Sequence, residues 1–128
     1  MSARVLIVDD EKRLAQSLAQ ALQLDYPGCQ VDTAYSGEEA LSALANRTYD
    51  LIVADVRMPG VSGLDLIKGV RYLDARVPII LMTGYGSASL RREAATLGVD
   101  HYVDKPFEAD DLISMVGALL PGPGGMDA

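Results

Sequence analysis

The fold is decided by the stretch Tyr49-Asp50-Leu51-Ile52-Val53-Ala54-Asp55-Val56-Arg57-Met58-Pro59-Gly60. Its four consecutive apolar residues, 51–54, predict a strand that is buried on both faces, as in the middle of a parallel sheet. Asp55 follows this strand directly, and a Met-Pro-Gly turn comes next. Open parallel sheets place their functional groups at the carboxyl ends of the strands, which makes Asp55 a candidate functional residue. The alternative is that Asp55 only forms a turn, because an Asp side chain readily hydrogen-bonds the backbone of the loop after it.

On either side of this strand, segments with strand composition alternate with segments of helical periodicity. Leu14, Leu18 and Leu22 have the spacing of a helix face, and Ser36 with Glu39 has the spacing of a capping box. The expected strands are 5–8, 29–34, 51–54, 78–82 and 101–103. The expected helices lie around 14–22, from 36, from 62, over 87–97 with Gly98 as the stop, and over 108–119.

Strand and helix alternate five times along the chain, which predicts an α/β fold. The expected architecture is a doubly wound, five-stranded parallel sheet with helices on both faces and right-handed crossovers. The segment 29–34 alternates polar and apolar residues and suits an edge of the sheet, whereas the fully apolar first, third and fourth strands suit its middle. This distribution favours the strand order 2-1-3-4-5, a common order among doubly wound sheets.

Length and composition indicate one acidic globular domain. The chain has 128 residues, 49% of them apolar, which is enough for a core without disulfides or metals. We expect the domain to span 1–120, and 121–128 to be a Pro/Gly-rich tail or the start of a linker. The single cysteine, Cys29, is expected to be a small buried hydrophobe. The net charge of −7 leaves no basic stripe for phosphate backbones, so this chain is not expected to bind nucleic acid directly.

The amino-terminal segment and the apolar runs predict a soluble, cytoplasmic protein. The first apolar run begins after Arg4 and ends in acidic residues, which is unlike a signal peptide. No apolar stretch approaches the ~20 residues that span a bilayer, so no membrane association is expected.

Polar side chains follow four of the five expected strands. Asp9 and Asp10 follow the first strand, Asp55 the third, Thr83 the fourth and Lys105 the fifth. Because the carboxyl ends of parallel strands share one edge of the sheet, these groups are expected to meet there. Each has a simpler interpretation when taken alone: the Asp pair could cap a helix, Thr83 could form a turn, and Lys105 could be a surface ammonium. The convergence of all of them favours a functional site.

The expected cluster of carboxylates has the chemistry of a magnesium site that accepts phosphate. Carboxylates held close together repel one another, and a hard divalent cation offsets that repulsion. An all-oxygen site that also includes water suits Mg²⁺ better than Ca²⁺. With Mg²⁺ and Lys105 in place, the expected anion is a phosphoryl group, and Asp55 is the expected nucleophile that forms an aspartyl phosphate. Thr83 would donate a hydrogen bond to one phosphoryl oxygen.

The same residues form four motifs, which are Val8-Asp9-Asp10-Glu11, Asp55-Val56-Arg57-Met58-Pro59-Gly60 with Gly63 after it, Met82-Thr83-Gly84, and Asp104-Lys105-Pro106-Phe107. In this combination the chain, from about residue 4 to residue 120, resembles the receiver domain of two-component response regulators. The resemblance implies a flavodoxin-like receiver fold and a phosphorylation-activated signalling domain. It does not imply an enzyme that acts on an external substrate.

The resemblance also implies a role for each site residue. Asp55 would accept the phosphoryl group from a sensor histidine kinase, and Lys105 would pair with that group. Asp10, Asp55 and the backbone carbonyl of Arg57 would bind Mg²⁺, with Mn²⁺ as an alternative ion, and Asp9 would act through a bound water. Thr83 and Tyr102 match the switch pair of the family. The surface that changes would consist of the fourth helix, the fifth strand and the fifth helix, around Arg91, Arg92, Tyr102 and Asp111.

The resemblance leaves the output open. The implied partners are a sensor histidine kinase or phosphotransfer protein, a downstream protein or output domain, and a second copy in a phosphorylation-dependent homodimer. One alternative is that the chain is the N-terminal receiver of a DNA-binding transcriptional regulator. A different class is a Mg²⁺-dependent phosphatase of small molecules, but such hydrolases need a second acid two residues after the nucleophile, and Arg57 occupies that position.

Overall fold

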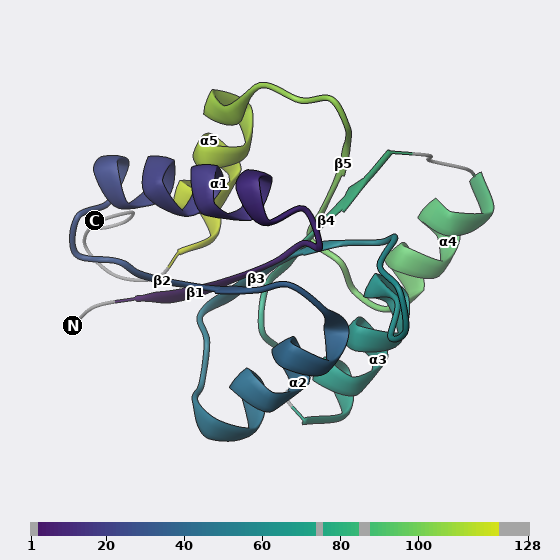
Figure 1. Ribbon diagram of the computed structural model, residues 1–128. Coiled ribbons are helices and arrows are strands. Elements are labelled where there is room, and N and C mark those ends of the chain that lie inside the picture. Colours follow the sequence, from purple (N-terminus) through teal and green to yellow (C-terminus); the bar gives the residue numbers. More distant parts are fainter. Residues whose placement is uncertain (1–2, 74–75, 85–87, 121–128) are drawn as a thin grey trace.

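The computed structural model describes residues 3–73, 76–84 and 88–120 (Figure 1). The expected tail, 121–128, and the expected start of the fourth helix at Ser87 lie outside the described residues. The strands are β1 (Arg4–Val8), β2 (Gln30–Ala34), β3 (Leu51–Asp55), β4 (Ile79–Thr83) and β5 (His101–Asp104). The helices are α1 (Lys12–Asp25), α2 (Gly37–Asn46), α3 (Gly63–Leu73), α4 (Ala88–Thr96) and α5 (Ala109–Leu119).

The five strands form one parallel sheet in the order β2-β1-β3-β4-β5, which confirms the predicted order. The register places Val8 beside Ala54, Asp55 beside Met82, and Thr83 beside Asp104. The last residues of neighbouring strands therefore lie side by side. All residues of β3 and β4 are buried, as their apolar runs predict, whereas β2 at the edge is only partly covered.

Two helical layers cover the sheet (Figure 1). Successive strand residues point to opposite faces, so Val5 and Ile7 pack with α1 and α5, and Leu6 and Val8 pack with α2, α3 and α4. Cys29 belongs to the first of these cores and is buried, as predicted. Within the described residues, no helix is both long and apolar enough to span a membrane.

The ends of several helices follow the signals in the sequence. The Ser36 side chain accepts a hydrogen bond from the backbone N–H of Glu39 at the start of α2, at 3.0 Å, which confirms half of the predicted capping box. The Glu39 carboxylate accepts from the backbone N–H of Tyr35, one residue before the position that a capping box requires. Gly98 has a φ of 76° after α4, a left-handed conformation that favours glycine and ends the helix.

Arg71 joins the end of α3 to the segments on either side of β4 and α4. Its guanidinium donates hydrogen bonds to the carbonyls of Val77 and Leu97, each at 2.7 Å, and of Gly98 at 2.8 Å. The carbonyls of Leu97 and Gly98 follow α4, where a helix leaves its last carbonyls without an intrahelical partner, and Val77 lies just before β4. Arg71 therefore fixes the position of α4 relative to α3.

Candidate functional site

The carboxyl edge of the sheet brings together the groups that the sequence predicted to meet there. Asp9, Asp55 and Thr83 are buried, and Asp10 is exposed. The carboxylates of Asp9, Asp10 and Asp55 each offer an oxygen, and these oxygens lie within 4.8 Å of one another. This geometry follows from the parallel sheet, because β1 and β3 are neighbours and end at the same level.

Lys105 reaches into this cluster from the residue after β5. Its Nζ lies 2.9 Å from Asp9 Oδ2 and 3.3 Å from Asp55 Oδ2, and 3.7 Å from Glu11 Oε1. The Lys105 side chain is only 18% exposed, so the interpretation of this residue as a surface ammonium is wrong. A partly buried cation that bridges two carboxylates offsets part of their mutual repulsion.

The alternative that the Asp pair caps α1 is partly correct. Asp9 Oδ1 accepts a hydrogen bond from the backbone N–H of Glu11 at 2.9 Å, just before the helix. The N-cap residue itself is Glu11, whose side chain makes no capping hydrogen bond. Asp9 thus binds the backbone of the loop through Oδ1 and binds the Lys105 ammonium through Oδ2.

The pKa of Asp55 is subject to opposing effects. Burial raises the pKa of its carboxyl above the ordinary value, and the nearby charge of Asp9 raises it further. The Lys105 ammonium acts in the other direction, and so does the backbone N–H of Arg57, which donates to Asp55 Oδ1 across a long 3.5 Å. The net effect is a raised pKa, so the folded protein resists the ionisation of Asp55 more than the unfolded chain does.

Lys105 remains a cation in this environment. Burial lowers the pKa of its ammonium, but the hydrogen bond to Asp9 and the charges of Asp55 and Asp9 outweigh that effect. Its pKa therefore lies above the ordinary value of 10.5. The site keeps one fixed positive charge among its carboxylates at neutral pH.

The raised pKa of Asp55 predicts that Asp55→Asn stabilises the metal-free protein at neutral pH. The stability associated with protonated Asp55 is present at acidic pH and is lost as pH rises from the unfolded value near 3.8 through the raised folded pKa. An Asn cannot ionise, while Lys105 keeps Asp9 as its partner. We expect a higher free energy of unfolding for Asp55→Asn in urea with EDTA, and a smaller difference at acidic pH.

Asp111→Asn, an exposed control, should differ from wild type by about 0.5 kcal/mol or less. Equal stability of Asp55→Asn and wild type at neutral pH would contradict this balance of charges.

Thr83 and Tyr102 lie on neighbouring strands beside this site. Thr83 is buried at the end of β4, and its carbonyl accepts a hydrogen bond from the backbone N–H of Lys105 at 2.7 Å. The Tyr102 hydroxyl is buried and has no hydrogen-bond partner in the part of the chain that the structure describes. Burying a hydroxyl without a hydrogen-bond partner costs free energy, so a different position of the ring that pairs the hydroxyl would be favoured.

Two residues near the site, Glu11 and Asp104, had no assigned role in the sequence, and the individual contacts of Arg91 were not predicted. Arg91 of α4 places its guanidinium 4.5 Å from the centroid of the Tyr102 ring and forms an ion pair of 2.6 Å with Asp104. Glu11 adds a fourth carboxylate at the edge of the acidic cluster. The position of Glu11 in the acidic run 9–11 could have predicted that it lies near the cluster. The contact between α4 and β5 had no signal in the spacing of the chain.

The acidic cluster has the donor set of a magnesium site. Its donors are hard carboxylate oxygens, and it lacks the imidazole and thiolate ligands that select softer metals. The exposed Asp10 leaves one side of the cluster open to water. A cation bound there would share Asp9 and Asp55 with Lys105.

Comparisons with known proteins agree on one family. The model of the response regulator receiver domain matches residues 5–117. An uncharacterized transcriptional regulatory protein of Bacillus subtilis, YkoG, is 37% identical over 116 residues, which cover 91% of this chain and 50% of YkoG. The response regulator MprA of Mycobacterium bovis is 36% identical, over 94% of this chain and 51% of its own length. The chain thus spans about half the length of the curated relatives it matches.

Solved structures show the same fold. The chemotaxis protein CheY4 of Vibrio cholerae is 31% identical, with a TM-score of 0.85 over 94% of this chain and all of CheY4. The response regulator TrrA of Thermotoga maritima, solved in complex with Mg²⁺ and BeF, is 38% identical, with a TM-score of 0.79 over 92% of this chain and 99% of TrrA.

Proposed function

The chain belongs to the family of response regulator receiver domains, and from that premise we propose that Asp55 is the residue that accepts the phosphoryl group. Receiver domains are signalling domains that work with histidine kinases and output domains. The observation that carries the proposal is the bridge of Lys105 between Asp9 and Asp55 at the carboxyl edge of the sheet. It sets a carboxylate nucleophile beside a fixed cation and two further acidic groups.

The proposed reaction is a transfer from a phosphohistidine. An oxygen of the Asp55 carboxylate forms a bond to phosphorus, while the bond from phosphorus to the imidazole nitrogen breaks and that nitrogen keeps the electron pair. Lys105 stabilises charge on the phosphoryl oxygens, as fixed donors do in phosphoryl transfer generally. The Thr83 hydroxyl donates a hydrogen bond to one of these oxygens. No general base is required once Asp55 is ionised.

We assign the metal of this reaction to the acidic cluster. Receiver domains bind Mg²⁺ in an acidic pocket, and the hard oxygens of Asp9, Asp10 and Asp55 suit that ion. Asp10, Asp55 and the Arg57 carbonyl would hold it directly, and Asp9 would act through water. The ion, Mg²⁺ or Mn²⁺, would supply positive charge for the phosphoryl oxygens. Its charge would also favour the ionised form of Asp55 and so reverse the effect of burial.

The proposed partners follow from the relatives. YkoG is named as a transcriptional regulatory protein and is about twice as long as the matched region. We propose a sensor histidine kinase or phosphotransfer protein as the phosphodonor, in the cytoplasm. The proposed output is a downstream protein or domain, with DNA-binding transcriptional output as the favoured case because of these relatives. A phosphorylation-dependent homodimer through α4, β5 and α5 is a further form of output.

The mass of the intact protein after incubation with acetyl phosphate and Mg²⁺ tests the proposal. We expect one added phosphoryl group on wild type and none on Asp55→Asn, and none on wild type when EDTA removes the metal. The surface control Asp111→Asn should be modified like wild type. An adduct that persists in Asp55→Asn would refute the assignment of the nucleophile. An adduct that forms in EDTA would refute the metal requirement.

We further propose that Tyr102 transmits the change at Asp55 to α4 and β5. Two observations support this proposal. The buried Tyr102 hydroxyl has no hydrogen-bond partner among the described residues. The Arg91 guanidinium stacks on the Tyr102 ring and forms an ion pair with Asp104, the residue directly before Lys105. A phosphoryl group that draws Lys105 and Thr83 toward itself would bias this arrangement, which is a population shift.

Tyr102→Ala should separate phosphorylation from its transmission. We expect acetyl phosphate to modify this variant within about threefold of the wild-type rate, because the Tyr102 hydroxyl makes no hydrogen bond to the reacting groups. Addition of Mg²⁺ and beryllofluoride should shift the amide resonances around Asp55 as in wild type, but those of β5 and α4 much less. The control Leu24→Ala removes an exposed apolar side chain of α1 and should behave like wild type. Equal shifts of β5 in Tyr102→Ala and wild type would refute the role of this ring.

A further inference from the structure

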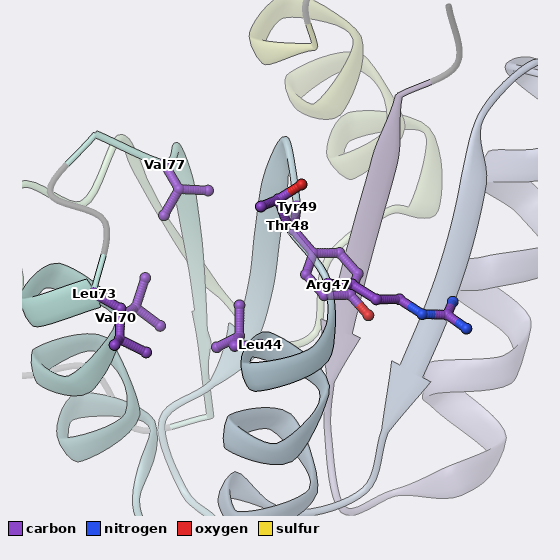
Figure 2. A pocket seen from close by; sticks show the side chains of 7 residues that line it. All are labelled: Leu44, Arg47, Thr48, Tyr49, Val70, Leu73 and Val77. Atoms are coloured by element: carbon purple, nitrogen blue, oxygen red, sulfur yellow. The ribbon is translucent and has the colours of Figure 1, made fainter.

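A second feature lies at the opposite edge of the sheet, where β3 and β4 begin. Here α2 and α3 enclose a hollow of about 120 Å³, lined by Leu44, residues 47–49, Val70, Leu73 and Val77 (Figure 2). We call it the α2–α3 hollow. Tyr49 precedes β3 and Val77 precedes β4, whereas Asp55 and Thr83 end those strands. The hollow is therefore separated from the acidic site by the length of the sheet.

The walls of the α2–α3 hollow are apolar and its polar groups lie at the rim. Leu44, Val70 and Val77 supply aliphatic wall, and Tyr49 supplies the edge of a ring. The Tyr49 hydroxyl donates to Asp32 Oδ2 at 2.7 Å, so the polar end of this ring is occupied. Burial, followed by the hydrogen bond to Asp32, raises the pKa of Tyr49 to about 12, so the phenol stays neutral. An apolar hollow of this kind is poorly suited to water.

The size of the α2–α3 hollow suits one aromatic ring. An engineered protein cavity of about 150 Å³ with Leu, Ile and Phe walls stays dry and binds benzene. A ring with a polar tip suits this hollow better than benzene, because Thr48, which carries a hydroxyl, is among the residues that line it. Tyrosine combines such an apolar ring with a polar tip.

An exposed tyrosine of this chain lies next to the hollow. Among the described residues, the large hydrophobic side chains with high exposure are Tyr72 at 90%, Leu24 at 81% and Leu73 at 63%. Tyr72 and Leu73 are the last two residues of α3, and Leu73 itself lines the hollow. A projecting ring and an open hollow thus sit together at one end of one helix. Contiguous apolar exposure of this kind marks interaction surfaces.

The charges at this end of the molecule permit contact with a second copy. The net charge of −7 makes most faces of the chain repel one another, and the acidic site most strongly. At the rim of the hollow, however, Arg47 Nη1 lies 3.2 Å from Asp32 Oδ2, and Arg4 Nη1 lies 3.6 Å from the same oxygen. Two guanidiniums share this carboxylate, so Asp32, which accepts from Tyr49 of the hollow, is not an uncompensated acid for a partner with the same sequence.

We propose that the α2–α3 hollow is a docking site for a second copy of this chain, in which Tyr72 of each copy enters the hollow of the other. Such a contact is isologous, since each copy supplies both the ring and the hollow, and it closes as a two-fold dimer. Leu73 of both copies lies near the axis and loses its exposure. The dimer does not involve α4, β5 or α5, so it forms without phosphorylation and is distinct from the homodimer proposed above.

Sedimentation equilibrium of the unphosphorylated full chain, without Mg²⁺, tests this inference. Small interfaces are weak, so the concentration series runs from ~1 μM to ~1 mM. We expect the weight-average mass of wild type to rise from monomer toward dimer. Tyr72→Ser should weaken the dimer tenfold or more and Tyr72→Phe should retain it, and because Tyr72 is exposed, neither change removes a contact of the fold. The matched control is Leu24→Ser, which removes an exposed apolar side chain from α1 on the other side of the sheet.

A second variant tests the hollow rather than the ring. Val77→Phe fills the α2–α3 hollow with the extra atoms of its own side chain and should also weaken the dimer tenfold or more. Amide resonances of Tyr49, Val70 and Val77 should shift with concentration in wild type and stay fixed in Tyr72→Ser. This inference is overturned if wild type remains monomeric to ~1 mM, or if Tyr72→Ser and Leu24→Ser weaken the dimer equally. A dimer whose shifts map to α4 and β5 would overturn it as well.

Discussion

Gly63→Ala is expected to lower the free energy of unfolding by about 3 kcal/mol or more, although it adds one methyl group. A Cβ at Gly63 would lie 2.7 Å from Val56 Cα, 2.9 Å from the carbonyl carbon of Asp55, and against the Asp55 carbonyl oxygen. All three are backbone atoms that cannot swing aside as a side chain would. The Gly63 N–H also donates to the Val56 carbonyl at 2.9 Å, which holds the start of α3 against the end of β3.

The same substitution should slow phosphoryl uptake, because it displaces the backbone that carries Asp55. Misplacement of a reacting group by about 1 Å costs on the order of 100-fold in rate. The measurements are urea denaturation and the time course of the acetyl phosphate adduct. Gly28→Ala is the matched control, because a Cβ there meets no atom within 4 Å and its φ is not left-handed. If Gly63→Ala unfolds at the same urea concentration as Gly28→Ala, the close packing of α3 on β3 is wrong.

Lys105→Met is expected to destabilise the metal-free protein by about 1–3 kcal/mol. Removal of one partner from a fully buried ion pair costs more, but the Lys105 side chain is 18% exposed and water offsets part of the loss. Asp9 and Asp55 would then face each other without the cation that bridges them, and the pKa of Asp55 should rise further. Phosphoryl uptake should slow by about 100-fold or more, because a fixed donor to the phosphoryl oxygens is gone.

Mg²⁺ provides the diagnostic contrast for Lys105→Met. A cation that binds only the folded protein stabilises it by mass action, and it would replace the missing positive charge. We therefore expect the gain in unfolding free energy on addition of Mg²⁺ to be larger for Lys105→Met than for wild type. Lys68→Met changes an exposed lysine of α3 and should respond to Mg²⁺ like wild type. An identical gain in all three proteins would show that Lys105 and the metal do not share the cluster.

The convergence of Asp9, Asp55, Thr83 and Lys105 was predictable because it depends on topology alone. Apolar runs identify the strands, parallel strands end at one edge, and the residue after each run must lie there. The spacing of 96 residues between Asp9 and Lys105 is no obstacle to this argument. The same argument also placed Asp10 at the edge, and its exposure agrees with a position at the open side of the cluster.

Features that depend on the direction of individual side chains could not be predicted in this way. The stacking of Arg91 on Tyr102 and its ion pair with Asp104 require a particular distance between α4 and β5, which periodicity does not specify. Nothing in the sequence distinguishes Arg71 from an ordinary cation on a helix surface, yet its guanidinium donates hydrogen bonds to three backbone carbonyls. The α2–α3 hollow exists because the side chains of α2, α3 and the residues before β3 and β4 do not fill the space between them. No pattern in the sequence predicts such a gap in packing.

The central claim is that Asp55 carries the phosphoryl group, and chemical trapping of the adduct tests it most directly. Wild type incubated with acetyl phosphate and Mg²⁺ is treated with borohydride, which reduces an aspartyl phosphate to homoserine and releases phosphate. Peptide mass spectrometry then locates the converted residue. We predict homoserine at position 55 alone, with Asp9 and Asp10 unchanged. Homoserine at position 9 or 10, or a phosphoryl adduct that yields no homoserine at all, would contradict the claim.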